Sequence, residues 1–223
     1  MLANGLMIVV DGAVEAAGHA EPRYYRDALL LGALREDVRR APLRKRVYEH
    51  LSFTHFSGRF LPGGFIPLLW AGPGAMADRF FDRAVAKGRA GERAAAYVQL
   101  GRALHLLSDM ACPVHAQRVI HETDPYEWLV ESEAPRLGRL PVPPPPRASR
   151  PSELVAAMAA LSQARRADAT RSAVGRLLRR AGLRRPVGHD EAAAQAEFLI
   201  PQAAAHAAAL LGLFLERSAA PVP

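Results

Sequence analysis

Helical periodicity, interrupted by prolines and glycines, is the feature that most constrains the fold of this sequence. In residues 24–40 (YYRDALLLGALREDVRR), apolar side chains recur on one face of a helix. These side chains are Leu29, Leu30, Ala33, Leu34 and Val38. Residues 92–111 (ERAAAYVQLGRALHLLSDMA) form the most apolar stretch. That helix has to end near Cys112, because Pro113 disfavours helical backbone in the residue before it and has no N–H.

The same reasoning predicts about seven helices along the chain. They span residues 5–17, 24–40, 78–91, 92–111, 124–134, 152–166 and 190–217. We expect Pro201 to kink or divide the last of them. Isoleucine, threonine and tyrosine are scarce, which argues against strands. We therefore predict an all-α fold, a single-domain multi-helix bundle over residues 1–223 with a proline-rich surface loop at 141–151.

The charge of the chain favours anionic partners. The formal net charge is +7, and an excess of this kind attracts nucleic acid, acidic lipid headgroups or phosphate esters. Much of it lies in residues 39–46 (RRAPLRKR) and 176–186 (RLLRRAGLRRP). Neither run carries the interleaved aromatic residues that stack single-stranded bases. We interpret both runs as a solvated arginine-rich surface rather than a nucleic-acid groove.

Two further features concern the cellular compartment. Cys112 is the one cysteine, so the chain forms no intramolecular disulfide. The N-terminal segment MLANGLMIVVDGAVEAAGHA has a short apolar run with no basic residue before it, and Asp11 follows closely. We therefore expect no signal peptide and no stretch that spans a bilayer. As it stands, the sequence is compatible with the cytoplasm.

The segment HLLSDMACPVHA, residues 105–116, places ionisable groups at the end of an apolar helix. His105 and Asp109 lie four residues apart, so both project from one face of that helix. His115 follows the break at Pro113, where the chain can turn back toward the same pocket. Imidazole and carboxylate suit zinc, and three protein ligands with an open position are typical of a catalytic site. For the first pair alone, an ordinary hydrogen bond between histidine and aspartate is the better interpretation.

Other segments supply further candidate ligands. Asp37 ends the second predicted helix, and His55 lies in the glycine-bordered loop THFSG. His121 and Glu127 follow in HETDPYEWLVE. Histidines and carboxylates thus come from several separate parts of the chain, as a multinuclear metal site requires. The hydrogen-bond interpretation weakens accordingly.

The central segment resembles a known family. LGRALHLLSDMACPVHAQ is similar to the signature of the bacterial zinc-dependent phospholipase C and S1/P1 nuclease superfamily. That signature is a histidine, an aspartate four residues on, a proline, and a histidine six residues after the aspartate. It is matched by His105, Asp109, Pro113 and His115. Other segments also resemble the family, so the resemblance runs over most of the chain: GALRED with HLSFTHF, DPYEWLVE, and EFLIPQAAAHAAALLGLFLE.

The resemblance implies two zinc ions and their ligands. The first ion would take Asp37, His55, His105 and Asp109. The second would take His115, Glu127 and one further ligand, either His121 or Asp124. An alternative for this last segment is a helix start with Asp124 as N-cap, Pro125 at N1 and Glu127 completing a capping box.

The start of the sequence does not decide whether a third zinc ion is bound. Members of the family begin their mature chain with tryptophan, whose terminal amine and carbonyl bind zinc. This sequence begins with Met1, and neither tryptophan is near that end. Either the third site is lost, or the start is truncated relative to the family, whose members are usually secreted.

The reaction implied by the resemblance is metal-assisted hydrolysis of a phosphodiester. Asp37 would orient or deprotonate the attacking water, and no cysteine or serine nucleophile is needed, so we interpret Cys112 as a packing residue. The substrate would be a phospholipid, as for a phospholipase C. The alternatives are single-stranded nucleic acid with the same metal core, and a non-catalytic relative that has lost the third metal.

Overall fold

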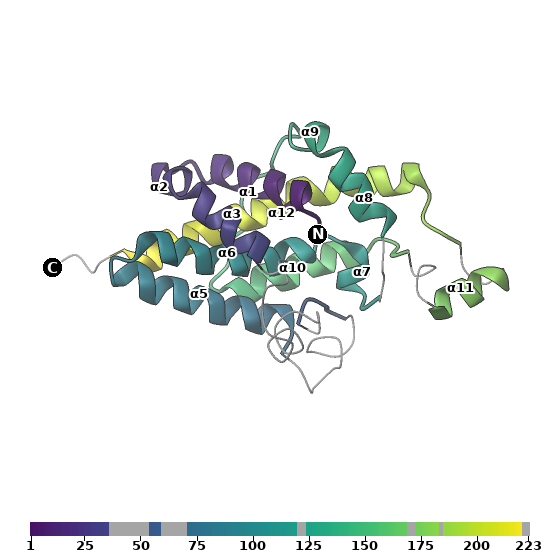
Figure 1. The fold of residues 1–223 in the computed structure, drawn as a ribbon, viewed down its shortest axis with the longest axis horizontal. Coiled ribbons are helices and arrows are strands. Elements are labelled where there is room, and N and C mark those ends of the chain that lie inside the picture. Colours follow the sequence, from purple (N-terminus) through teal and green to yellow (C-terminus); the bar gives the residue numbers. More distant parts are fainter. Residues whose placement is uncertain (36–53, 59–70, 120–123, 169–172, 183–184, 220–223) are drawn as a thin grey trace.

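The computed structural model describes residues 1–35, 54–58, 71–119, 124–168, 173–182 and 185–219. Within these ranges the chain forms eleven helices and no strand (Figure 1), so the all-α prediction is confirmed. The longer helices are α1 (Ala3–Ala17), α3 (Arg26–Arg35), α5 (Pro73–Arg89), α6 (Arg93–Asp109), α10 (Pro151–Gln163) and α12 (His189–Ser218). The shorter ones are α2 (Ala20–Tyr24), α7 (Pro113–Ala116), α8 (Pro125–Ser132), α9 (Ala134–Leu137) and α11 (Ala173–Arg180).

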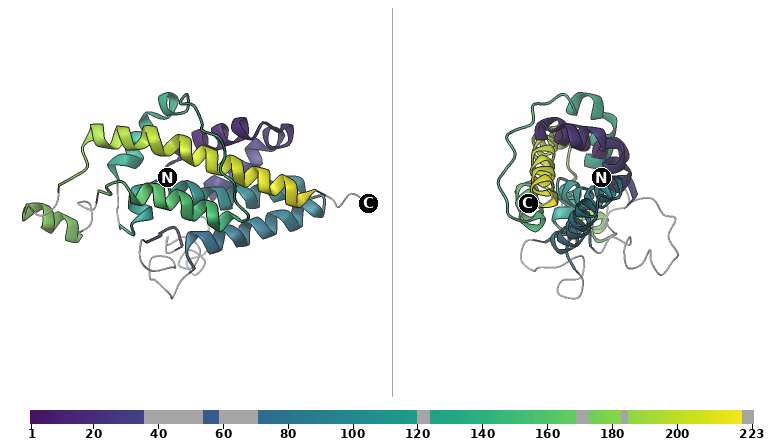
Figure 2. Two further views of the ribbon diagram at one scale, coloured as in Figure 1. Left: turned by 180° about the vertical axis from the view of Figure 1, so that it is seen from behind. Right: turned by 90° about the vertical axis from the view of Figure 1, so that its left-hand side faces the viewer.

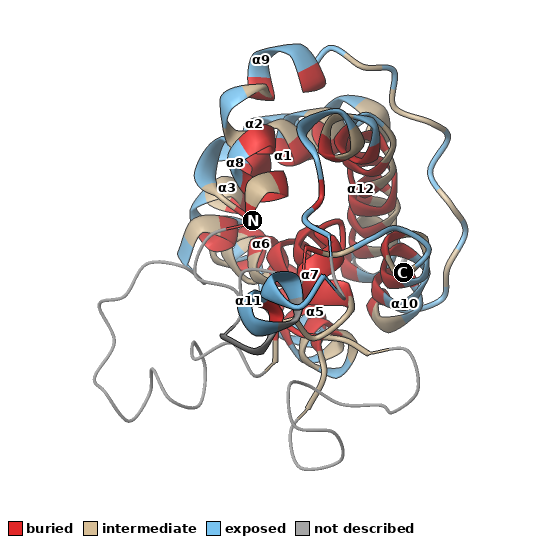
Figure 3. Ribbon diagram, turned by 90° about the vertical axis from the view of Figure 1, so that its right-hand side faces the viewer, coloured by how far each residue is buried: buried red, intermediate tan, exposed pale blue. Residues whose placement is uncertain are grey.

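Helix α6 runs through the middle of the bundle. It packs along α3 and α5, while α1 packs along α12 (Figures 1 and 2). The buried faces of these helices join in one hydrophobic cluster, and the buried residues line the inside of the bundle (Figure 3). Residues 103–109, the last two turns of α6, are all buried. The end of this helix therefore lies inside the protein, and so do the side chains that it carries.

Two glycines allow α3 and α6 to approach closely. A Cβ added at Gly32 would lie 2.1 Å from the carbonyl oxygen of Val98. A Cβ added at Gly101 would lie 2.0 Å from the carbonyl oxygen of Leu29. Backbone atoms cannot move aside as a flexible side chain can, so only glycine fits at these two positions. The contact holds the helix that carries His105 and Asp109 firmly against α3.

The predicted face of the second helix is confirmed where the structure describes it. Leu29 and Ala33 are buried, and Leu30 and Leu34 are half-buried. Val38 lies outside the described residues. The predicted helices 78–91, 92–111, 124–134 and 152–166 correspond to α5, α6, α8 and α10, with ends shifted by a few residues.

Of the two alternatives predicted at Pro201, a kink or a division of the helix, the division is wrong, because α12 continues through this proline. The helix extends unbroken from His189 to Ser218, and Pro201 is buried within it. A proline inside a helix removes one backbone hydrogen bond. The packing of α12 along α1, α10 and α8 offsets that loss.

The short helices α2, α7, α9 and α11 were not predicted. Each has eight residues or fewer, too few for a repeating apolar stripe. In α7 and α9 a proline occupies the first turn. The N–H groups of a first turn make no hydrogen bond within the helix, so a proline there removes none. Prolines that look like helix breaks in the sequence therefore also begin new helices.

Helix α12 bears on the expectation that no stretch spans a bilayer. By length and composition it qualifies as a candidate span, with a mean hydropathy of 1.7 over its most apolar window. Of that window, 67% is buried inside the protein. Burial of this extent is typical of a central helix in a bundle, and the alanine-rich sequence of α12 serves close packing against its neighbours.

The second arginine run is solvated where the structure describes it. Arg176, Arg179 and Arg180 are exposed on α11, which stands out from the bundle (Figure 1). The first run, 39–46, lies outside the described residues. Residues 141–148 contain no helix, and Pro151 begins α10, so the proline-rich connection ends just before this residue.

Candidate metal centre

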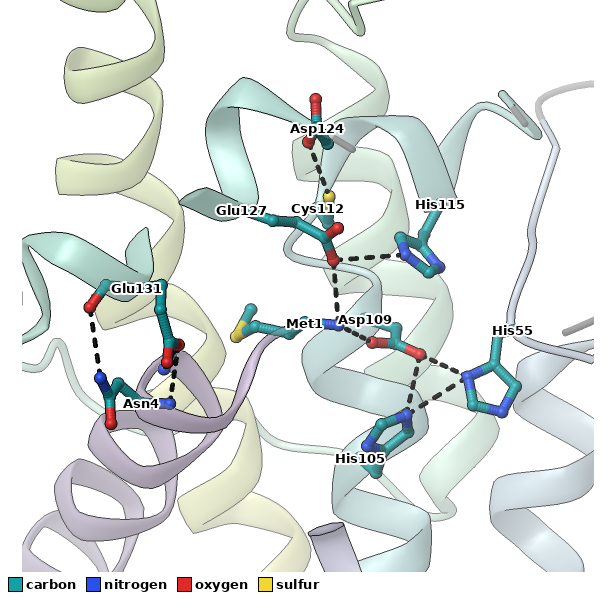
Figure 4. A network of polar contacts seen from close by, with 11 residues as sticks. Met1, Asn4, His55, His105, Asp109, Cys112, His115, Asp124, Glu127 and Glu131 are labelled. Atoms are coloured by element: carbon teal, nitrogen blue, oxygen red, sulfur yellow. Dashed lines mark hydrogen bonds and ion pairs between the residues drawn. The ribbon is translucent and has the colours of Figure 1, made fainter. Parts of the chain in front are cut away.

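The central motif is folded around the end of α6. His105 and Asp109 lie on its last turn, and Asp109 is its final residue. A short turn leads to Pro113, which begins α7 and places His115 on that helix. His55 approaches from residues 54–58, and Glu127 from the first turn of α8. All five side chains are buried and converge in one place (Figure 4).

The first group of donor atoms consists of His55, His105 and Asp109. His55 Nδ1 lies 2.6 Å from Asp109 Oδ2, and His105 Nε2 lies 3.1 Å from the same oxygen. The two imidazole nitrogens are 3.3 Å apart. The hydrogen-bond interpretation accounts for the contact of His105 with Asp109, but a second histidine from a distant segment joins it. One ligand atom from each of the three residues lies within 4.8 Å of the others, which suits a shared metal ion.

The pKa shifts of His55 and Asp109 favour the forms of these two side chains that a metal ion binds. Burial lowers the pKa of His55, although the Asp109 carboxylate opposes the shift. Burial also acts to raise the pKa of Asp109, but the nearby His105, the Met1 amine and His115 outweigh it and hold that pKa well below its usual range. A neutral imidazole and an ionised carboxylate are the forms that coordinate a cation.

The second group consists of Cys112, His115 and Glu127. One donor atom from each lies within 4.8 Å of the others. His115 Nε2 is 3.5 Å from Glu127 Oε1, and the His115 ring stacks on Phe56 with centroids 5.1 Å apart. The backbone N–H of Ser57 donates to the His115 carbonyl at 3.0 Å. The segment that carries His55 is thus fixed against the second group as well as the first.

The α-amino group of Met1 lies between the two groups (Figure 4). Its nitrogen is 2.7 Å from Asp109 Oδ1 and 3.1 Å from Glu127 Oε1. One ammonium therefore contacts a carboxylate from each group, so the two groups are neighbours in one polar centre. The sequence alone indicates no contact between this end and the site. No local pattern signals the contact, because it joins residues more than a hundred positions apart.

The remaining predicted residues fall in different places. Asp124 is buried beside the second group, where Cys112 Sγ donates to its Oδ2 at 3.4 Å. It is the N-cap of α8 and Pro125 follows at N1, but Asp124 makes no side-chain capping hydrogen bond. The helix-start alternative is therefore right about the position, while the capping bond expected from Asp124 is absent. Asp37 and His121 lie outside the described residues.

Cys112 has polar contacts that sequence reasoning did not indicate. A single cysteine at the end of an apolar helix is typical of a core, and Cys112 does belong to the buried hydrophobic cluster. Its thiol also contacts the Asp124 carboxylate and lies near His115 and Glu127. Burial raises its pKa well above the usual value, and the Glu127 and Asp124 carboxylates raise it further. Its spacing of three residues from His115 was the available signal.

The donor set fits zinc. The first group offers two imidazoles and a carboxylate, and the second offers imidazole, carboxylate and thiol. Catalytic zinc sites in enzymes typically have three protein ligands, which donate nitrogen, sulfur or oxygen atoms. Their burial would keep bulk water away from a bound ion.

Comparison with known proteins identifies relatives by structure and not by sequence. No family model and no curated protein matches the sequence. The fold matches the alpha-toxin of Clostridium absonum with a TM-score of 0.68 and 14% identity, over 100% of this chain and 67% of the toxin. It matches the alpha-toxin of an avian strain of Clostridium perfringens with a TM-score of 0.62 and 14% identity, over 96% of this chain and 63% of the toxin. The chain thus shares the all-helical fold of these two clostridial alpha-toxins.

Proposed function

We propose that the chain is a zinc-dependent phosphodiester hydrolase of the phospholipase C type. The observation that carries the proposal is the pair of adjacent buried donor groups around Asp109 and Glu127. Burying this many ionisable side chains costs free energy of folding unless their charges are paired or bind a metal ion. Two neighbouring cations would offset that cost, and two neighbouring cations are what phosphodiester hydrolysis uses.

Each residue of the centre would have one role, either as a metal ligand or in activating water. His55, His105 and Asp109 would bind one ion, and His115 and Glu127 a second. When bound, such ions polarise the phosphoryl oxygens and lower the pKa of a coordinated water. Asp37 would orient that water and accept its proton. The lowered pKa of His55 keeps its ring neutral and ready to bind at neutral pH.

A phospholipid is the substrate class that we propose. The fold likeness to the clostridial alpha-toxins, which spans the whole of this chain, supports that choice. The net charge of +7 suits an anionic phosphodiester. The exposed arginines of α11 have no aromatic residue among them, which argues against a platform for stacking bases.

The test is a product analysis on zinc-loaded protein that carries any affinity tag at its C-terminus. Vesicles of phosphatidylcholine should yield diacylglycerol and a phosphorylated headgroup. We expect His105→Ala to lower the rate at least about 100-fold, because a lost metal ligand removes several kcal/mol of transition-state stabilisation. His189→Ala is the matched control, since His189 is an exposed histidine at the start of α12.

Two results would redirect the proposal. Release of mononucleotides from single-stranded DNA, with vesicles left intact, would assign the same metal core to a nuclease. Zinc-loaded, folded protein that cleaves neither substrate would indicate a non-catalytic relative, and the enzyme proposal would be rejected.

A further inference from the structure

We propose that the Cys112 thiolate is a ligand of the second metal ion, in the place for which the family resemblance suggested His121 or Asp124. The inference rests on the metal centre of the proposed function, but not on phosphodiester cleavage. It assigns to this chain a mixed sulfur, nitrogen and oxygen site of Cys112, His115 and Glu127. Its neighbour would be an all-nitrogen and oxygen site of His55, His105 and Asp109.

The geometry of the three donors suits a single ion. Their ligand atoms all lie within 4.8 Å of one another. Around a tetrahedral zinc, with a Zn–S bond of about 2.3 Å and Zn–N or Zn–O bonds of about 2.0–2.1 Å, neighbouring ligand atoms are about 3.5 Å apart. Small side-chain rotations would bring the group to that spacing. All three residues are buried, Cys112 completely.

Backbone hydrogen bonds fix Cys112 between the end of α6 and the start of α7. Its N–H donates to the Asp109 carbonyl at 3.0 Å, and its carbonyl accepts from the N–H groups of His115 and Ala116 at 3.1 Å each. Pro113, at the start of α7, restrains the backbone next to it. Cys112 is the N-cap of α7 and has extended backbone, and His115 is the third residue of that helix. The thiol and the imidazole thus come from the same short corner of the chain.

The surroundings of Cys112 are partly polar. The residue belongs to the buried hydrophobic cluster, as a packing cysteine would. Its thiol also contacts the Asp124 carboxylate at 3.4 Å and shares its donor group with His115 and Glu127. A divalent cation bound there would offset the charge of these two buried carboxylates. A thiolate selects zinc or cobalt over magnesium and calcium.

Cobalt substitution tests the assignment directly. A cobalt ion bound by thiolate absorbs in the near ultraviolet through sulfur-to-metal charge transfer, whereas nitrogen and oxygen ligands give only the weaker visible bands. We expect protein loaded with Co²⁺ to show the charge-transfer band. Cys112→Ser should lose that band together with one of the bound cobalt ions. His105→Ala should lose the other cobalt ion and keep the band.

A second measurement uses the unaltered chain, in case Cys112→Ser fails to fold. X-ray absorption at the zinc edge of the zinc-loaded protein should show a sulfur neighbour at about 2.3 Å. Circular dichroism and a thermal melt of the variant separate a lost ligand from a lost fold.

Each outcome decides a different claim. Bound cobalt without the charge-transfer band, and zinc without a sulfur neighbour, would overturn the role of Cys112 and leave the phosphodiesterase proposal standing. If Asp124→Asn loses the second ion while Cys112→Ser keeps it, Asp124 is the ligand and our assignment is wrong. A charge-transfer band in protein that cleaves no phosphodiester would support the assignment and reject the enzyme proposal. Protein that binds no metal would overturn both.

Discussion

Asp109 is the residue that joins the two halves of the polar centre. Its Oδ2 faces His55 and His105, while its Oδ1 faces the Met1 amine, which also contacts Glu127. Each carboxylate oxygen thus serves a different set of partners. A change at this one position should affect folding as well as metal binding.

We expect Asp109→Asn to destabilise the metal-free protein by about 3–5 kcal/mol, because it leaves a buried ammonium with one of its two carboxylates gone. Asparagine keeps the volume of aspartate, so the loss reports on charge. Urea unfolding measures it. The control is Asp11→Asn, which breaks the exposed pair with Arg26 and should have a much smaller effect because solvent screens that pair. Equal effects of the two variants would contradict the importance of the buried contact.

His206 makes a prediction about pH. Its Nδ1 contacts the Gln202 carbonyl at 2.7 Å, and burial lowers its pKa. In the unfolded chain the ring takes up a proton near pH 6.5, whereas in the folded protein it does so only at lower pH. The unfolded state therefore binds more protons as the pH falls through about 6.5, so stability should decrease there. The melting temperature of metal-free protein should follow this trend.

The variant His206→Gln checks the origin of that trend. Glutamine does not titrate, so the decrease in melting temperature below about pH 6.5 should become shallower. The remaining slope would come from other buried groups such as His55, whose pKa is also lowered. An unchanged slope would show that His206 does not contribute.

At the scale of the helices, the contact between α3 and α6 tolerates the least added volume, because backbone meets backbone at Gly32 and Gly101. We expect Gly101→Ala to lower stability by about 1–3 kcal/mol, because its Cβ would lie 2.0 Å from a backbone oxygen and the helices would have to separate. Zinc affinity should fall as well, since α6 carries His105 and Asp109. Denaturant unfolding and zinc titration measure the two effects.

Gly212 in α12 provides the matched control for that substitution. A Cβ added there has no neighbour within 4 Å. Alanine favours helix over glycine by up to about 1 kcal/mol, so Gly212→Ala should leave stability unchanged or raise it. A harmless Gly101→Ala would mean that the close helix contact does not constrain the fold.

The helices that could be predicted from sequence are those with a long apolar stripe. The face of residues 24–40 and the apolar run 92–111 both identify helices that the structure contains. The short helices α7 and α9 could not be predicted, since four residues give no period and a leading proline resembles a break. Pro201 also resembles a helix break in the sequence, but it is buried inside α12 and the helix continues through it.

Within the centre, local spacing predicts some residues, and only the folded chain reveals the others. His105, Asp109 and His115 are close in sequence, so their common location follows from helix geometry. His55 and Glu127 are candidates by residue type alone, the resemblance assigns each to an ion, and the structure brings both to the same place. The contact of Cys112 with Asp124 could not be predicted, because the two residues are brought together only by the fold. The Met1 contact is wholly a product of tertiary folding.

At the scale of the whole molecule, four separate segments meet at the proposed metal centre. They are the N-terminal Met1, residues 54–58, the α6–α7 corner and the start of α8. The first ion would link residues 54–58 to α6, and the second would link the α6–α7 corner to α8. Their binding energy would add to the stability of the fold. Metal content is therefore the quantity on which both the functional and the structural interpretation depend.

The most direct measurement is zinc per chain by elemental analysis, on the purified protein and on the double variant His105→Ala with Asp109→Ala. We expect at least two zinc ions in the unaltered protein, because the structure offers two adjacent groups of donors. We expect a sharp decrease in the variant. Absence of zinc from the unaltered protein, with the variant equally well folded, would contradict the proposed metal centre.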